Sequence, residues 1–159
     1  MVEFAISAIL LSLILSGAIE FGFIMGHKVE LDNAARSGAR WAASNSVTSA
    51  NNSWSSAASP ASNTTEGQVL SAGGTSSIPN NDSHISIQYY DNAGASPVLC
   101  GHYSATSSSF VAASGYTQAS CVDRSNLVTV TVSDAYPLFT RLFAASPTLS
   151  ASATFEVMN

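Results

Sequence analysis

The N-terminal part of the chain carries a long apolar stretch that passes into an amphipathic pattern. Residues 4–19 are apolar or small throughout, and apart from Glu20 this composition continues to residue 26. Beyond it, apolar and small residues recur at spacings of three and four as far as Ala43. The pattern predicts one α-helix over residues 3–44, about 60 Å long at 1.5 Å per residue.

The first half of this predicted helix is apolar on all sides. It runs for about 23 residues, which is long enough to cross a bilayer. A secretory signal peptide is the alternative, but no basic residue precedes the apolar run and the helical pattern continues past it without a small-residue cleavage site. A small domain can cover only the second half of such a helix. We therefore expect the first half to lie in lipid or against other copies of itself.

Two carboxylates, Glu3 and Glu20, interrupt the apolar half. A carboxylate buried without a partner is costly, so each needs a cation or a proton. Glu3 lies beside the α-amino group of Met1, and the amine of one copy could pair with Glu3 of a neighbour, which would set the register of assembly. The alternative for Glu3 is a solvated terminus at the membrane interface.

The apolar half also contains a Gly-x-x-x-Gly spacing, Gly22 to Gly26. This spacing allows close helix–helix approach in an apolar environment. It also weakens a helix, by about 1 kcal/mol per glycine relative to alanine, so local melting during assembly is the alternative. The residues expected to pack in a filament core are Phe4, Leu11, Ile14, Gly17, Glu20, Gly22 and Gly26.

The segment after the helix is rich in Ser, Asn and Ala and poor in branched apolar residues. Residues 45–74 contain one acid, Glu66, and no base. Such a segment buries little core, and we expect an extended surface loop with a short helix over residues 65–72. Three Asn-x-Ser/Thr triplets begin at Asn51, Asn63 and Asn81, and each is a candidate glycosylation site, although such triplets are frequent in Asn/Ser-rich sequence.

Strand patterns appear in the C-terminal half. Apolar and polar residues alternate over residues 85–89, 128–132 and 149–157. This period of two predicts an antiparallel sheet with one apolar face, which the second half of the long helix can cover. Residues 137–145 indicate a short helix with Pro137 in its first turn.

These elements predict an α+β fold of two parts. A helix of residues 1–44 serves as a transmembrane or filament-core element. A small β-rich head of residues 45–159, with long Ser/Asn-rich loops, packs against its second half.

Composition narrows the functional classes. Only 9% of the residues are charged and 46% are apolar, whereas a typical soluble domain is about 25% charged. The net charge is −5 and only five residues are basic, so the chain lacks the basic stripe that nucleic-acid binding requires.

The two cysteines, Cys100 and Cys121, fit one disulfide in an oxidising compartment; two buried free thiols are the alternative.

The sequence gives no sign of catalysis. His27, His84 and His102 are scattered, and no His/Cys/Asp cluster has the spacing of metal ligands. No Gly-x-Ser-x-Gly elbow is present. We expect a protein that is not an enzyme and that uses no cofactor and no metal.

The two ends of the chain resemble TadE-like proteins. The opening motif, Val-Glu-Phe-Ala followed by a Leu/Ile run and then Gly-Ala-Ile-Glu-Phe-Gly at residues 17–22, carries one part of this likeness. The stretch Asn-Ala-Ala-Arg-Ser-Gly-Ala-Arg at residues 33–40 is similar to the family's "NAAREGAR" stretch. A Val/Thr strand, a Tyr-Pro-Leu turn and residues 148–154 carry the third part.

The resemblance implies a type IV pilin-like fold and a place in the tight-adherence (Flp) branch of type IV pilus systems. Such proteins are made with a short basic leader, cut by a prepilin peptidase and inserted in the inner membrane, so the chain resembles the processed form. Glu3 would take the role of the glutamate near a mature pilin N-terminus, although it lies two positions nearer the start.

The function expected from the residues and the resemblance is that of a major pilin. Copies would polymerise into an extracellular filament, with the inner membrane, the prepilin peptidase and the pilus assembly machinery as earlier partners. One alternative is a minor TadE-like pseudopilin that primes or tips a pilus built from another subunit. Another is a membrane-anchored surface binding module that does not polymerise.

Overall fold

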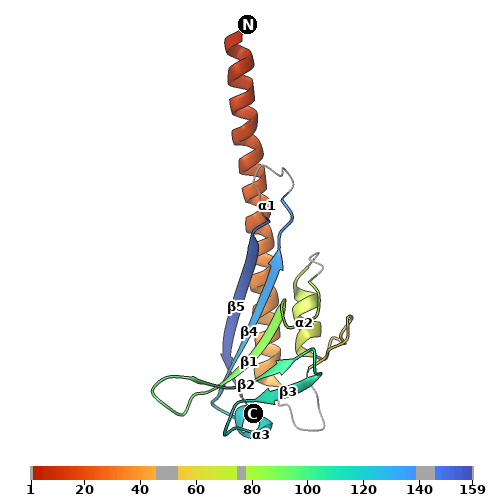
Figure 1. The fold of residues 1–159 in the computed structure, drawn as a ribbon, viewed down its shortest axis with the longest axis vertical. Coiled ribbons are helices and arrows are strands. Elements are labelled where there is room, and N and C mark those ends of the chain that lie inside the picture. The colour runs from red at the N-terminus through yellow and green to blue at the C-terminus, as the bar shows by residue number, and fades with distance from the viewer. Residues whose placement is uncertain (1, 46–53, 75–77, 139–145, 159) are drawn as a thin grey trace.

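The computed structural model describes residues 2–45, 54–74, 78–138 and 146–158, and at residues 2, 3 and 5 it describes the backbone only. The N-terminal half of the long helix projects from the head as a bare rod (Figure 1). In chain order the elements are α1 (Val2–Ser44), α2 (Thr65–Ala72), β1 (Ile85–Asp91), β2 (Val98–Ser104), β3 (Ser109–Ala112), α3 (Gln118–Cys121), β4 (Leu127–Ala135) and β5 (Thr148–Glu156).

The strands form one antiparallel sheet in the order β3-β2-β1-β4-β5. The predicted strands over 85–89, 128–132 and 149–157 are β1, β4 and β5, and the predicted short helix is α2, so the α+β fold is confirmed. Three elements between residues 98 and 121 were not anticipated, because Gly, Ser and Cys interrupt any alternation there.

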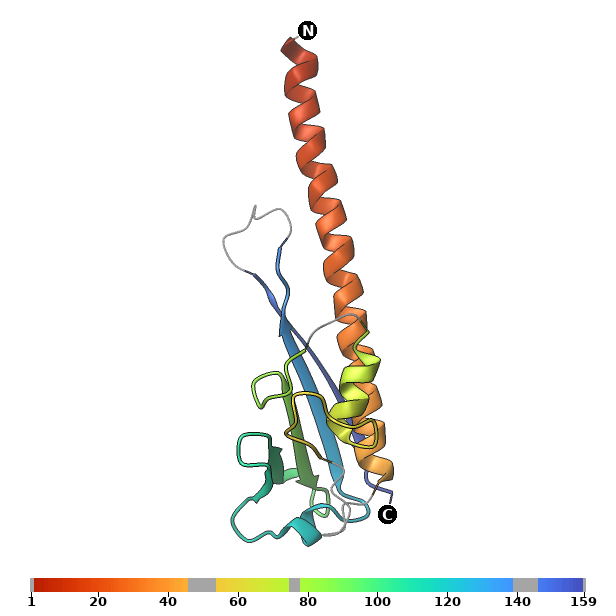
Figure 2. The ribbon, with the colours of Figure 1, turned by 90° about the vertical axis from the view of Figure 1, so that its right-hand side faces the viewer.

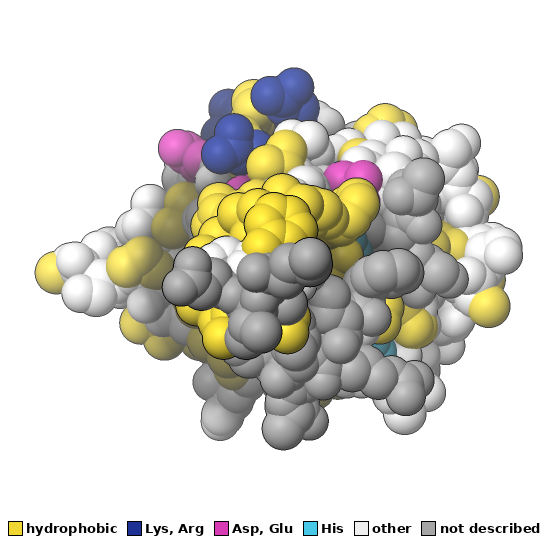
Figure 3. All heavy atoms as spheres, turned by 90° about the horizontal axis from the view of Figure 1, so that it is seen from above, with side chains coloured by type: hydrophobic (Ala, Val, Ile, Leu, Met, Phe, Trp, Pro, Cys, Tyr) yellow, Lys and Arg dark blue, Asp and Glu magenta, His cyan; other side chains and the backbone are white. Residues whose placement is uncertain are grey.

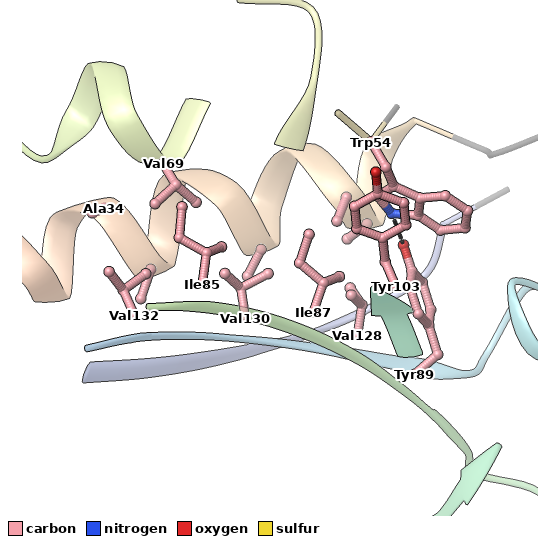
Figure 4. Close-up of a cluster of buried hydrophobic side chains, with 14 of the residues drawn as sticks. Ala34, Trp54, Val69, Ile85, Ile87, Tyr89, Tyr103, Val128, Val130 and Val132 are labelled. Carbon is pink, nitrogen blue, oxygen red and sulfur yellow. Dashed lines mark hydrogen bonds between the residues drawn. The ribbon is translucent and has the colours of Figure 1, made fainter. Parts of the chain in front are cut away.

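The second half of α1 packs along one face of the sheet, with α2 beside it (Figure 2). Its inward residues are mostly alanines that are fully buried, together with Leu31. Small side chains let the helix approach the sheet closely. Val69 of α2 and the alternating Ile and Val residues of β1 and β4 converge on this helix in Figure 4.

At Gly38, α1 lies close to both α2 and β4. A Cβ atom at this position would lie 2.4 Å from Cγ2 of Val69 and 3.4 Å from Cγ1 of Val130. The glycine therefore lets α1 fit between α2 and β4.

The expectation that residues 45–74 bury little core is wrong for part of that segment. Trp54 is only 5% exposed. Its ring stacks nearly parallel to those of Tyr103 and Phe110, and its Nε1–H donates to the Tyr89 hydroxyl over 3.3 Å (Figure 4). The low-complexity segment thus contributes the largest aromatic side chain in the core of the head.

The predicted disulfide between Cys100 and Cys121 is present. Both cysteines are fully buried, and the bridge joins β2 to α3 with a Cα–Cα distance of 5.6 Å. The predicted helix over residues 137–145 falls largely on residues 139–145, which lie outside the described residues.

Candidate assembly surface

The first half of α1 exposes its apolar side chains to the surroundings. Phe4 is 80% exposed, Leu11 66% and Ile14 62%, and these values are typical of the segment. Among the described side chains of residues 4–26, Glu20 alone is buried. The helix is long and apolar enough to cross a membrane.

The glycines of this half leave space around the helix. Among the residues that the structure describes, nothing lies within 4 Å of the position that a Cβ would take at Gly17, Gly22 or Gly26. The helix continues unbroken through all three positions. The helix packing predicted at these glycines stays a prediction.

The two carboxylates of the apolar half, Glu3 and Glu20, have different surroundings. Glu20 is 4% exposed, so its side chain is covered within the chain itself. Glu3 lies in the first turns of α1, but its side chain and Met1 fall outside the described residues. The pairing of Glu3 with an amine of another copy stays a prediction.

The apolar half ends where α1 meets the β4–β5 hairpin. Nε2 of His27 lies 3.3 Å from Oδ2 of Asp134, a contact that becomes an ion pair when the imidazole is protonated. The adjacent Lys28 donates to the backbone carbonyl of Ser150. These two contacts tie consecutive residues of α1 to consecutive strands of the sheet at one level.

Asp32 pairs with Lys28, its Oδ1 lying 3.4 Å from Nζ. Arg36 also lies four residues from Asp32 in the sequence, but the ion pair that the structure shows is the one with the lysine.

A buried carboxyl group lies in the head. Glu66 of α2 is 1% exposed, and burial raises its pKa to about 7, against the lowering effect of backbone hydrogen bonds from its own N–H and from Ser55. The Ser55 N–H donates to Oε2 over 2.9 Å, whereas Oε1 has no hydrogen-bond partner among the described residues. No sequence pattern indicated this group, because its burial depends on the fold of residues 54–64 over α2.

The candidate glycosylation sites differ in their surroundings. Asn51 lies outside the described residues, and Asn63 is exposed before α2. Oδ1 of Asn81 accepts the backbone N–H groups of Ser83 and His84, forming the turn that leads into β1. Glycosylation at any of the three stays a prediction.

Within the described ranges, no group of three or more His, Cys, Asp or Glu side chains is placed to hold a metal ion.

The fold and the exposed helix define a class of protein: a small α+β head carried on one long N-terminal helix whose outer half is bare and apolar. Residues 1–40 match the family described as TadE-like protein, which confirms the resemblance over that part of the chain. The likeness noted near the C-terminus lies outside this match. No curated protein and no solved structure matches the chain.

Proposed function

We propose that this chain is a pilin-type structural subunit, and specifically the major subunit of a helical homopolymer. The bare half of α1 carries the proposal. Twelve large apolar side chains from Phe4 to Met25 are at least half exposed. Removing them from water is worth on the order of tens of kcal/mol, because each contributes about 1.5–3 kcal/mol.

Two environments can cover such a helix all round. A bilayer can hold it as a membrane anchor, and the same surface can pack against α1 of other copies in a filament core. The proposed sequence of events uses both: the chain is held in the inner membrane first and then passes into an extracellular filament. The TadE-like match supports an association with Tad pilus machinery, including a prepilin peptidase that would act on a precursor.

The head suits the outside of such a filament. Its loops are rich in Ser, Asn and Ala, and only 9% of the whole chain is charged. The disulfide within the head favours an oxidising location outside the cytoplasm. The proposed role is structural and requires no catalysis and no cofactor.

Two other roles use the same helix. A minor pseudopilin would prime or tip a filament built from another subunit, and an anchored binding module would remain in the membrane. Abundance separates the three. A major subunit is the dominant protein in sheared surface material, a minor one is scarce there, and an anchored module stays with the membrane fraction.

The test is electron microscopy of sheared filaments from cells that express the chain, with each subunit traced. We expect a core of α1 helices and heads outside. In the same cells, Glu3→Ala should abolish filaments while leaving the chain in the membrane, because an unpaired amine would remain in the core. Filaments that lack this chain, or that hold it only at one end, would refute the major-subunit proposal.

A further inference from the structure

The sheet of the head has a second face, on the side away from α1. The buried Ile and Val side chains of β1 and β4 point toward α1 (Figure 4), so the residues that alternate with them point the other way. In Figure 2, α1 and α2 both lie on one side of the sheet. We refer to the opposite side of the sheet as the outer face.

The strand register arranges the outer face in rows that run across the strands. The central row crosses all five strands and consists of Val111, His102, Gln88, Thr129 and Thr154. The row on one side of it consists of Leu99, Tyr90, Leu127 and Glu156, and the row on the other side of Ser86, Thr131 and Ser152. The outer face therefore combines hydroxyl, amide and imidazole groups with a few apolar side chains.

Two hydrogen bonds link side chains on the outer face. The Tyr90 hydroxyl donates to Oε1 of Gln88 over 2.8 Å, which orients the amide so that its NH₂ group can donate to a ligand. The hydroxyl oxygens of Thr129 and Thr154 lie 2.8 Å apart. These contacts hold the polar groups of the central row on a rigid sheet.

The outer face also offers apolar surface to a ligand. Leu99, beside Tyr90, and Val111, beside His102, are each 41% exposed. Ser152 at the far edge of the sheet is exposed as well. Apolar and hydrogen-bonding groups thus lie side by side on one surface.

Charge is scarce on this face. None of the five strands that the structure describes contains Lys or Arg, and their three acids, Asp91, Asp134 and Glu156, lie at or next to strand ends. Three of the five basic residues of the chain belong to α1. Seen from above, Lys and Arg side chains gather at one margin beside that helix (Figure 3). The middle of the outer face therefore carries hydroxyl and amide groups in place of charges.

We propose that the outer face binds a neutral polysaccharide. Hydroxyl and amide groups both donate and accept hydrogen bonds, as the hydroxyls of a sugar do. Tyr90, Leu99 and Val111 provide the apolar surface that the C–H side of a sugar ring contacts. A neutral polymer brings no charge that must be desolvated, whereas an acidic polymer would lose ionic hydration on a face that has no cation to replace it.

A neighbouring head is the other possible occupant, and the position of the face argues against it. α1 packs on the inner side of the sheet, and in the proposed homopolymer α1 lies in the filament core. The outer face then points away from the filament axis and is repeated on the outside, once in each subunit. This repetition rests on the proposed homopolymer, whereas the face itself is complete in one chain.

Repetition matters because each contact on an uncharged, hydrated surface is weak. A polysaccharide chain that reaches several subunits binds them together, and such avidity exceeds the affinity of one site by roughly a hundred-fold or more. A filament should therefore hold a neutral polymer far more tightly than a single chain does.

The first test is co-sedimentation with insoluble polysaccharides. Particles of cellulose, chitin and starch are the neutral probes, and alginate beads are the acidic one. We expect filaments to sediment with at least one neutral probe and less with alginate. The full chain in detergent micelles should bind the same probe, roughly a hundred-fold more weakly. Absence of binding to all three neutral probes, or stronger binding to alginate, would overturn the proposal.

The second test changes the middle of the face. Gln88→Glu keeps the acceptor for the Tyr90 hydroxyl, removes the NH₂ donor and adds a charge, so half-maximal binding should need a concentration roughly ten-fold higher. Tyr90→Ala removes the ring and should raise that concentration roughly three- to ten-fold. Ser71→Glu, at an exposed position of α2 on the other side of the sheet, adds the same charge and should bind as the unsubstituted chain does.

Folding of the variants is checked by the fluorescence of Trp54, which packs in the core on the inner side of the sheet. If Gln88→Glu does not fold, Ser152→Glu places a charge at an exposed position of the same face and should weaken binding. Folded variants of the face that bind as well as the Ser71→Glu control would overturn the proposal.

The outcomes keep this inference apart from the proposed function. A traced filament in which a neighbouring head covers Gln88 and Tyr90 would overturn the polysaccharide site and leave the homopolymer intact. If the chain forms no filament, the proposed function fails, and binding of the neutral probes by the chain in micelles still decides whether the outer face is a polysaccharide site.

Discussion

Glu66 should make the stability of the head depend on pH. Its carboxyl group is buried and accepts the Ser55 N–H, and burial raises its pKa from 4.5 to about 7. Because the folded-state pKa lies above the unfolded value, the contribution of Glu66 is fully present below about pH 4.5 and is lost as the pH rises through about 7. The change in pKa corresponds to about 3 kcal/mol in total.

The perturbation is Glu66→Gln, which keeps the shape of the side chain and removes the ionisation. Between about pH 5 and pH 8 the unsubstituted chain should lose about 2–3 kcal/mol more unfolding free energy than the variant. The assay is urea unfolding of the full chain in detergent micelles at a series of pH values. Tryptophan fluorescence reports the transition, because Trp54 packs in the aromatic cluster next to this site.

The two chains are compared by how steeply the unfolding free energy changes with pH, not by its absolute value. The amide of glutamine needs its own hydrogen bonds, and their cost does not change with pH. Glu156→Gln, which removes a carboxylate from an exposed position of β5, is the matched control and should keep the slope of the unsubstituted chain. A Glu66→Gln variant with that same slope would refute the burial argument.

Three further predictions concern packing and the disulfide. Gly38→Ala should destabilise the chain by about 1–3 kcal/mol in urea unfolding, because the added Cβ would lie 2.4 Å from Val69; unchanged stability would contradict the close approach. Trp54→Ala should cost about 3–5 kcal/mol in the same assay, and a cost below about 1 kcal/mol would place the ring outside the core. Reduction of the Cys100–Cys121 bridge should lower the unfolding free energy by about 3 kcal/mol, measured with and without reductant.

Local patterns were sufficient for the elements whose burial alternates regularly. The apolar run and the spacings of three and four predicted α1 nearly to its observed ends. Period-two alternation predicted β1, β4 and β5, since each has one face on the core and one toward solvent. The need of α1 for partners outside the chain also follows from its sequence, because no small head can cover an apolar helix of this length.

Local sequence patterns do not predict the elements whose burial depends on residues far away in the sequence. β2 was missed because Gly101 and Cys100 break its alternation, and its register depends on Phe110 of β3, whose ring lies over Gly101: a Cβ there would be 2.3 Å from Cζ. Trp54 was assigned to a surface loop because its neighbours are polar, yet the rings of β1, β2 and β3 form a site for it.

The sequence by itself determined that one long helix has a bare apolar half, since hydrophobicity and helical period are local properties. It also determined the alternating strands and the cysteine pair. Only the tertiary structure decided which charges the head uses and which it leaves outside. Asp32 could pair with a lysine or an arginine one turn away, and the placement of α1 on the sheet left Arg36 and Arg40 facing outward. The same packing buried Glu66, because burial and charge pairing depend on contacts between segments far apart in the chain.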